Sequence, residues 1–95
     1  MASRDKDPLN AFRNSIDQID SKILELLNRR TEAALEIGKL KKANNQPVYA
    51  PAREKAVIER LVKDNHGPLP DQSVEEIFKA IINQVRSFEE TGKDS

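Results

Sequence analysis

Residues 9–41 read LNAFRNSIDQIDSKILELLNRRTEAALEIGKLK, and this stretch decides the fold. Apolar residues recur along it every three or four positions, which is the spacing of one face of an α-helix. Asp7 and Pro8 precede it, as a capping residue and a proline at the first helical position. The segment from Asn44 to Pro47 stops it. The pattern predicts one long helix, whose apolar stripe consists of Leu9, Phe12, Ile16, Ile19, Ile23, Leu26, Leu27, Ala34, Ile37 and Leu40.

Two shorter helices are expected after it. The second starts near Pro51 and ends around Asn65, where a glycine and two prolines follow. The third is capped by Asp71 or Ser73, and Glu76 stands three residues after Ser73 as in a capping box. There is no strand-like alternation and no internal repeat. The predicted fold class is all-α, with three helices and a very long first helix.

Length and composition limit what the chain can be. Its 95 residues make a single domain at most, so we expect one domain over residues 1–95, with frayed tails at 1–7 and 91–95. Hydrophobic residues make up 37% of the chain, below the roughly 45–50% of a typical domain, a figure that also counts glycine. The core is therefore expected to be thin. Association with a second chain would ease this shortage.

The charged residues argue against several classes of function. Sixteen acidic and sixteen basic residues cancel, so general binding of nucleic acid is not expected. The sequence has no cysteine and one histidine, which leaves no basis for a disulfide or a zinc site. No apolar run approaches the roughly 20 residues that span a bilayer, and the first segment, MASRDKD, lacks the apolar stretch of a signal peptide. We expect a cytoplasmic protein without a metal, a cofactor or a membrane partner.

The first helix is too long for a small monomer. About 34 residues extend roughly 50 Å at the rise of an α-helix, whereas a compact domain of this length is only about 30 Å across. The simplest explanation is a homodimer in which two long helices run antiparallel. The alternative is a monomer whose helix breaks at Gly38.

Two cations occupy places that the periodicity reserves for the core. Steps of seven from Ile16 lead to Ile23, Arg30 and Ile37, and Lys41 lies along the neighbouring edge. A buried cation is costly unless it is paired, although an ion pair or a side chain that reaches solvent would also explain each one. Arg30 and Lys41 are about 16 Å apart by helix rise. The gap between their tips suits one small carboxylate-bearing molecule.

Further charged residues extend this anomaly. Arg13 is about 25 Å from Arg30 along the helix, so it can share a site with Arg30 only if it comes from an antiparallel partner chain. Arg53 and Glu54 stand at the head of the second helix, and Glu89 follows the apolar stripe of the third. Glu54 could instead be a first-turn acid favoured by the helix dipole. Glu89 could instead be an exposed acid in a fraying last turn.

An ordered set of motifs contains these residues. It consists of Arg13 with the following Ile-Asp-x-Ile-Asp, ILELLNRR at 23–30, IGKLK at 37–41, PARE at 51–54, GPLP at 67–70, and Ile77-Phe78 through Ile81-Ile82 to Glu89. In this order and spacing, from about Leu9 to Glu90, the chain resembles the all-helical chorismate mutases. The resemblance is greatest to the N-terminal domain of bifunctional chorismate mutase–prephenate dehydratases.

The resemblance implies an intertwined homodimer that rearranges chorismate to prephenate in aromatic amino-acid biosynthesis, without a cofactor. Such a pericyclic reaction needs a flexible dianion held in its reactive shape and donors for the charge that grows on the ether oxygen. It further implies that Arg13 of the partner chain and Arg30 grip the two carboxylates. Lys41 would bridge a carboxylate and the ether oxygen.

The resemblance assigns roles to the later helices as well. Arg53 would support the carboxylate end of the substrate, and Glu54 would accept a hydrogen bond from its ring hydroxyl. Glu89 would face the ether oxygen, where the family has glutamine or glutamate. The catalytic set is then Lys41, Glu89 and Arg30. The chain departs from some members at Ala50, where they have aspartate, and at Val85, where they have serine.

Three other interpretations stay open at this stage. An isochorismate-pyruvate lyase on the same fold would need a similar arginine–lysine site, although Glu54 favours the mutase. A helical dimerisation module could use buried charges to set its pairing register. The chain could also be a regulatory or detached domain of a larger enzyme.

Overall fold

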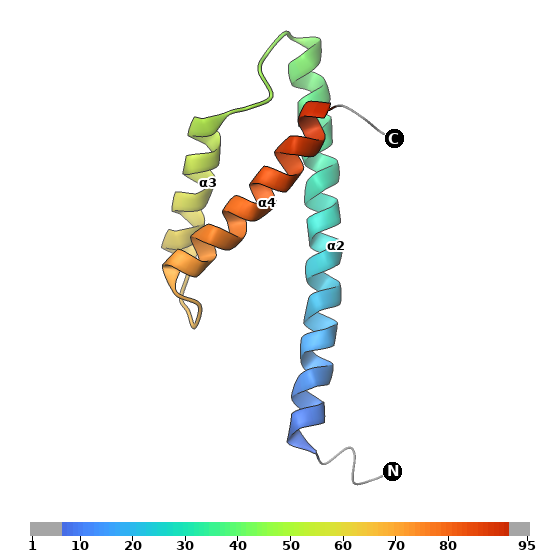
Figure 1. The fold of residues 1–95 in the computed structure, drawn as a ribbon, viewed down its shortest axis with the longest axis vertical. Helices are drawn as coiled ribbons and strands as arrows, with labels where there is room; N and C mark the ends of the chain where they lie inside the picture. The colour runs from blue at the N-terminus through green and yellow to red at the C-terminus, as the bar shows by residue number, and fades with distance from the viewer. Residues whose placement is uncertain (1–6, 92–95) are drawn as a thin grey trace. The chain divides into compact units, whose positions relative to one another are not determined.

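The computed structural model describes residues 7–91 of the chain, and side chains for residues 7–90. It contains α2 (Pro8–Ala43), α3 (Pro51–Asp64) and α4 (Asp71–Thr91) (Figure 1). The described part of the chain has no strand, so the predicted all-α class with a very long first helix is confirmed. The chain divides into two compact units, residues 1–33 and 34–95. The predicted fraying of residues 1–6 and 92–95 lies outside the described residues.

Helix α2 begins and ends where the sequence predicts. The Oδ1 atom of Asp7 accepts a hydrogen bond from the Leu9 amide at 3.0 Å, which satisfies one of the free donors of the first turn. The helix ends at Ala43, and Asn45 follows with a positive φ of 56°. Gly38 lies inside the uninterrupted helix. The alternative of a break at Gly38 is therefore wrong.

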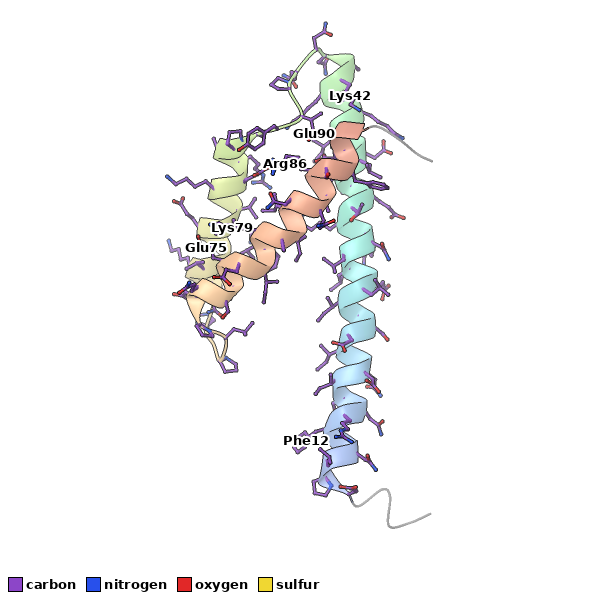
Figure 2. All side chains as sticks on the ribbon, in the orientation of Figure 1. Phe12, Lys42, Glu75, Lys79, Arg86 and Glu90 are labelled. Atoms are coloured by element: carbon purple, nitrogen blue, oxygen red, sulfur yellow. The ribbon has the colours of Figure 1, made fainter. Side chains whose placement is uncertain are left out.

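In the first unit the apolar stripe of α2 is left exposed. This unit contains one helical segment and no second element among its described residues. Phe12, labelled in Figure 2, is 69% exposed. The stripe residues that are 48–69% exposed in this segment are Leu9, Phe12, Ile16, Ile19, Ile23 and Leu26, together with Leu24 beside them. Full burial of one such side chain would contribute about 1.5–3 kcal/mol, which this unit leaves unrealised at the stripe.

The second unit has a small core between α3 and α4. The two helices run in opposite directions around a short turn (Figure 1). Val57 of α3 packs with Val74 and Ile82 of α4 in this core, and each of the three is 8% exposed. The remaining apolar residues of both helices are half-buried or exposed. The thin core that the composition predicts is therefore found.

The turn between α3 and α4 is organised by Asn65. Its Nδ2 atom donates to the Leu69 carbonyl and to Oδ1 of Asp71, both at 2.8 Å, and its Oδ1 accepts from the Gly67 amide at 3.0 Å. Gly67 has a φ of 78°, a conformation that residues other than glycine seldom adopt. One side chain thus links the end of α3 to the start of α4.

The start of α4 differs from one prediction. The helix begins at Asp71, so Ser73 lies inside the first turn and is not a capping residue. The Glu76 carboxylate instead accepts from the Gln72 side chain at 3.2 Å. The predicted capping box at Ser73 is wrong, because the helix has already started when the chain reaches Ser73.

Candidate active site

Lys41 lies in the last turn of α2 and is half-buried. Its Nζ atom donates to the Val48 carbonyl at 3.4 Å. The connecting segment turns back over the helix end, where the Gln46 amide donates to the Lys41 carbonyl at 2.7 Å. The ammonium group is therefore held between α2 and the segment that leads into α3.

Glu89 of α4 lies against Gly38 of α2. A Cβ atom at Gly38 would be 3.6 Å from both Cγ and Oε2 of Glu89. Gly38 is buried and Glu89 is half-buried. Residues three apart on a helix share a face, so Glu89 packs on the face of α2 that also carries Lys41. Two residues predicted for the site thus come to one helix face from elements far apart in the sequence.

Glu54 is half-buried in the first turn of α3 and forms an ion pair with α4. Its Oε2 atom lies 3.4 Å from Nε of Arg86. The Arg86 guanidinium also lies 4.5 Å from the centre of the Tyr49 ring, and its Nη2 donates to Oδ1 of Asn83 at 2.6 Å. Figure 2 shows Arg86 on α4, on the side that faces α3. Glu54 is therefore held by a tertiary contact as well as by its position near a helix N-terminus.

The sequence analysis did not single out Arg86 or Tyr49. One signal was available, since Arg86 follows the buried Ile82 by four positions and therefore borders the apolar stripe of α4. Tyr49 gave no signal, because it lies in an irregular segment between helices.

A groove of about 710 Å³ between α3 and α4 is bordered by this ion pair. Its apolar floor includes Ile58 and Val62, and Glu54, Tyr49 and Arg86 lie together in its lining. The volume is in the range of sites for small molecules. The second unit therefore offers carboxylates and a guanidinium beside an apolar floor.

The other predicted site residues are placed less closely. Arg53 precedes Glu54 on α3 and is exposed. Arg13 and Arg30 lie on α2 in the first unit, where Arg13 is exposed and Arg30 is half-buried. The partial burial of Arg30 agrees with its place in the apolar stripe. That these three residues form one site with Lys41, Glu54 and Glu89, and that the latter three lie together, stays a prediction.

Within residues 7–90, no three His, Cys, Asp or Glu side chains gather as a metal site would require. No helix of this described part is long and apolar enough to cross a membrane. The groups assembled in the second unit are an ammonium, carboxylates and a guanidinium.

Comparison with known proteins identifies the family. The family of chorismate mutase type II matches residues 12–90. The bifunctional chorismate mutase/prephenate dehydratase of Neisseria gonorrhoeae is 46% identical over 77 residues, which are 81% of this chain and 21% of that protein. The corresponding protein of Aquifex aeolicus is 35% identical over 85% of this chain and 24% of its own length. The chain thus spans about a fifth to a quarter of the length of these curated relatives.

Solved structures of chorismate mutases have the same fold as this chain. Chorismate mutase (Form II) from Thermus thermophilus superposes with a TM-score of 0.89 at 32% identity, over 93% of this chain and all of that one. Chorismate mutase from Helicobacter pylori, in complex with prephenate, gives 0.81 at 28% identity, over 88% of this chain and 91% of that one. The fold and the sequence together define an all-helical domain of the chorismate mutase class. The chain belongs to the chorismate mutase type II family, so the predicted resemblance is confirmed.

Proposed function

We propose that this chain rearranges chorismate to prephenate, a step of phenylalanine and tyrosine biosynthesis, at a site shared by two copies of the chain. The observation that carries the proposal is the packing of Glu89 on Gly38, on the α2 face that also carries Lys41. The proposal needs two groups that face one substrate atom from different helices, and this packing brings α4 to that face of α2. The type of reaction is inferred from membership of the chorismate mutase type II family.

Binding of the substrate depends on cations. Chorismate is a dianion, and its two carboxylates would be held by Arg30 and by the partner's Arg13. A guanidinium presents two parallel donors that match a carboxylate, which fixes orientation as well as position. Arg53 supports the carboxylate end. Together these contacts fold a flexible molecule into the shape in which the reacting carbons meet.

The ether oxygen is the centre of the chemistry. As the carbon–oxygen bond breaks and the new carbon–carbon bond forms, negative charge grows on that oxygen. Lys41 donates to it from one side and Glu89 from the other. Glu89 can donate only when protonated, because an ionised carboxylate is an acceptor alone. Donors that are in place before the reaction need no reorganisation as this charge develops.

Glu54 accepts a hydrogen bond from the ring hydroxyl of the substrate. Arg86 occupies its Oε2 atom, so Oε1 remains for the substrate. A carboxylate offers about four acceptor sites on its two oxygens, so both contacts are compatible. Where some family members add an aspartate, this chain has Ala50, and Glu54 therefore makes this contact alone.

The partner copy is required by the proposal. The exposed apolar stripe in residues 9–26 of α2 is the surface that a second antiparallel α2 would cover. The same arrangement would deliver Arg13 to the other copy's site. The cytoplasmic location stays a prediction from the sequence.

The test is a direct assay. Loss of chorismate absorbance is followed with the wild-type chain and with Lys41→Ala, and isochorismate is supplied in parallel. The proposal expects turnover of chorismate alone, with a large loss in the variant. Release of pyruvate from isochorismate, without turnover of chorismate, would favour a lyase on the same fold.

A further inference from the structure

Arg86 of the second unit contacts three side chains from three parts of the chain. Tyr49 lies under the plane of its guanidinium at 4.5 Å from the ring centre. Glu54 lies 3.4 Å from its Nε atom and Asn83 accepts from its Nη2 at 2.6 Å. These three partners come from the connecting segment, from α3 and from α4. A planar guanidinium with its face and two edges in contact has little freedom to rotate.

This ion pair differs from three others among the described residues. Lys39–Glu36, Arg60–Asp64 and Lys79–Glu75 each join residues three or four apart on one helix, with side chains at least 42% exposed. Pairs of that kind contribute little, because solvent screens them. In the Arg86–Glu54 pair the two side chains are 23% and 24% exposed, and the pair connects α4 to α3. It is therefore a structural contact between two helices.

The contact has a consequence for Glu54. A glutamate side chain has three rotatable torsions and loses freedom when it binds. Arg86 removes part of that freedom in advance by pairing with Oε2. A group that is oriented before binding gives a higher affinity for the same hydrogen bond.

We propose that Arg86 is a positioning residue that fixes the Glu54 carboxylate for the ring hydroxyl of the substrate. The inference rests on the proposed role of Glu54. The hydroxyl takes no part in the bonds that break and form, so it contributes equally to the ground state and the transition state. Loss of Arg86 should therefore raise KM and leave kcat nearly unchanged.

The experiment is a double-mutant cycle on the full chain. Arg86→Met keeps the length of the side chain and removes the guanidinium, and Glu54→Met removes both carboxylate oxygens. Lys79→Met is the matched control, because Lys79 also lies on α4 and its ion pair with Glu75 stays on that helix. We measure kcat and KM for chorismate with the wild type, each single variant and the Arg86→Met/Glu54→Met double variant. Circular dichroism monitors folding.

We expect Arg86→Met to raise KM about fivefold to tenfold, the size of effect for losing one typical hydrogen bond. Arg86→Lys restores the charge without the flat guanidinium and should raise KM by about twofold. In the Glu54→Met background, Arg86→Met should change KM by less than about twofold, since its effect passes through Glu54. Lys79→Met should match the wild type.

The outcomes separate this inference from the proposed function. An unchanged KM in Arg86→Met, with a raised KM in Glu54→Met, overturns the positioning role and leaves the role of Glu54 intact. Additive effects of the two substitutions, or a loss in kcat alone, also overturn it. An unchanged KM in Glu54→Met overturns both, as does a wild type without mutase activity. If Arg86→Met does not fold, Arg86→Gln, which also removes the guanidinium, is compared in the two backgrounds with the same expected changes in KM.

Discussion

Glu89 of α4 packs directly on Gly38 of α2, where an added Cβ atom would lie 3.6 Å from both its Cγ and its Oε2 atoms. This relationship connects the end of the chain to the helix that carries Lys41. It leaves room for one more carbon atom at position 38 and for little beyond it.

The first prediction concerns that space. Gly38→Val adds two carbon atoms beyond the Cβ position, close to where Glu89 lies, so the carboxyl group must move. We expect kcat to fall at least about tenfold, because a misplaced catalytic group loses much of its effect. Gly38→Ala is the control, since its Cβ makes an ordinary contact and alanine favours a helix by about 1 kcal/mol over glycine. Its kcat should be near the wild-type value and its melting temperature should rise. Equal kcat values for Gly38→Val and the wild type would show that the position of Glu89 does not matter.

The second prediction is a pH profile. If protonated Glu89 donates to the ether oxygen, kcat rises as pH falls from 8 towards 5, because the protonated fraction of a carboxyl group grows by up to about tenfold per pH unit above its pKa. Glu89→Gln donates at every pH, so its profile should be flat over the same range. Steady-state assays at half-unit pH steps check both. A flat wild-type profile, or a variant with the same slope as the wild type, would contradict the assignment.

The third prediction concerns the shared site. Arg13→Ala and Lys41→Ala should each be nearly inactive alone. When the two are unfolded, mixed in equal amounts and refolded, half of the dimers should combine one chain of each kind. Such a heterodimer regains one complete site if Arg13 acts across the interface, so about a quarter of the wild-type activity should return. No recovery from a mixture that contains heterodimers would mean that Arg13 and Lys41 act within one chain.

The fourth prediction tests the partner surface. Ile19 is 56% exposed in the stripe of α2, and Ile19→Glu places a charge where a second α2 would pack. Analytical ultracentrifugation should show dissociation, with loss of activity. Ser21→Glu adds the same charge on the face of α2 opposite the stripe and should leave the assembly unchanged. A dimer that withstands Ile19→Glu would place the interface elsewhere.

The fifth prediction concerns the turn between α3 and α4. Asn65→Ala removes three hydrogen bonds and should lower the free energy of unfolding by about 1–2 kcal/mol, since exposed hydrogen bonds contribute less than buried ones. His66→Ala, at the next position, is the control and should have little effect. Urea denaturation followed by circular dichroism measures both. Equal stability of the two variants would show that the Asn65 side chain does not stabilise this turn.

The sequence was sufficient for the helices because each is specified locally. Apolar spacing, Asp7 before Pro8 and the break near Gly67 act within a few residues, and the three helices appear where those signals lie. The capping box at Ser73 failed because the helix already starts at Asp71, whose Oδ1 accepts a hydrogen bond from Asn65 of the preceding turn.

The candidate site could be predicted only in part, because some of its contacts join different helices. Misplaced charge identified Lys41, Glu54 and Glu89, since each departs from an expected pattern along its own helix. The pairing of Glu54 with Arg86 depends on how α3 and α4 are rotated about their axes, and periodicity within one helix does not contain that information. The resemblance named the role of Glu54 but gave no sign of Arg86.

Loss of chorismate absorbance with Lys41→Ala, compared with Lys42→Ala, tests the central claim most directly. Lys42 is the adjacent, exposed cation of the same helix turn, so it controls for the removal of a positive charge. We predict that Lys41→Ala lowers kcat about 10²- to 10³-fold, the effect of removing one donor to developing charge, and that Lys42→Ala stays within about twofold of the wild type. Equal activity of the two variants, or a wild type that does not consume chorismate, would contradict the account.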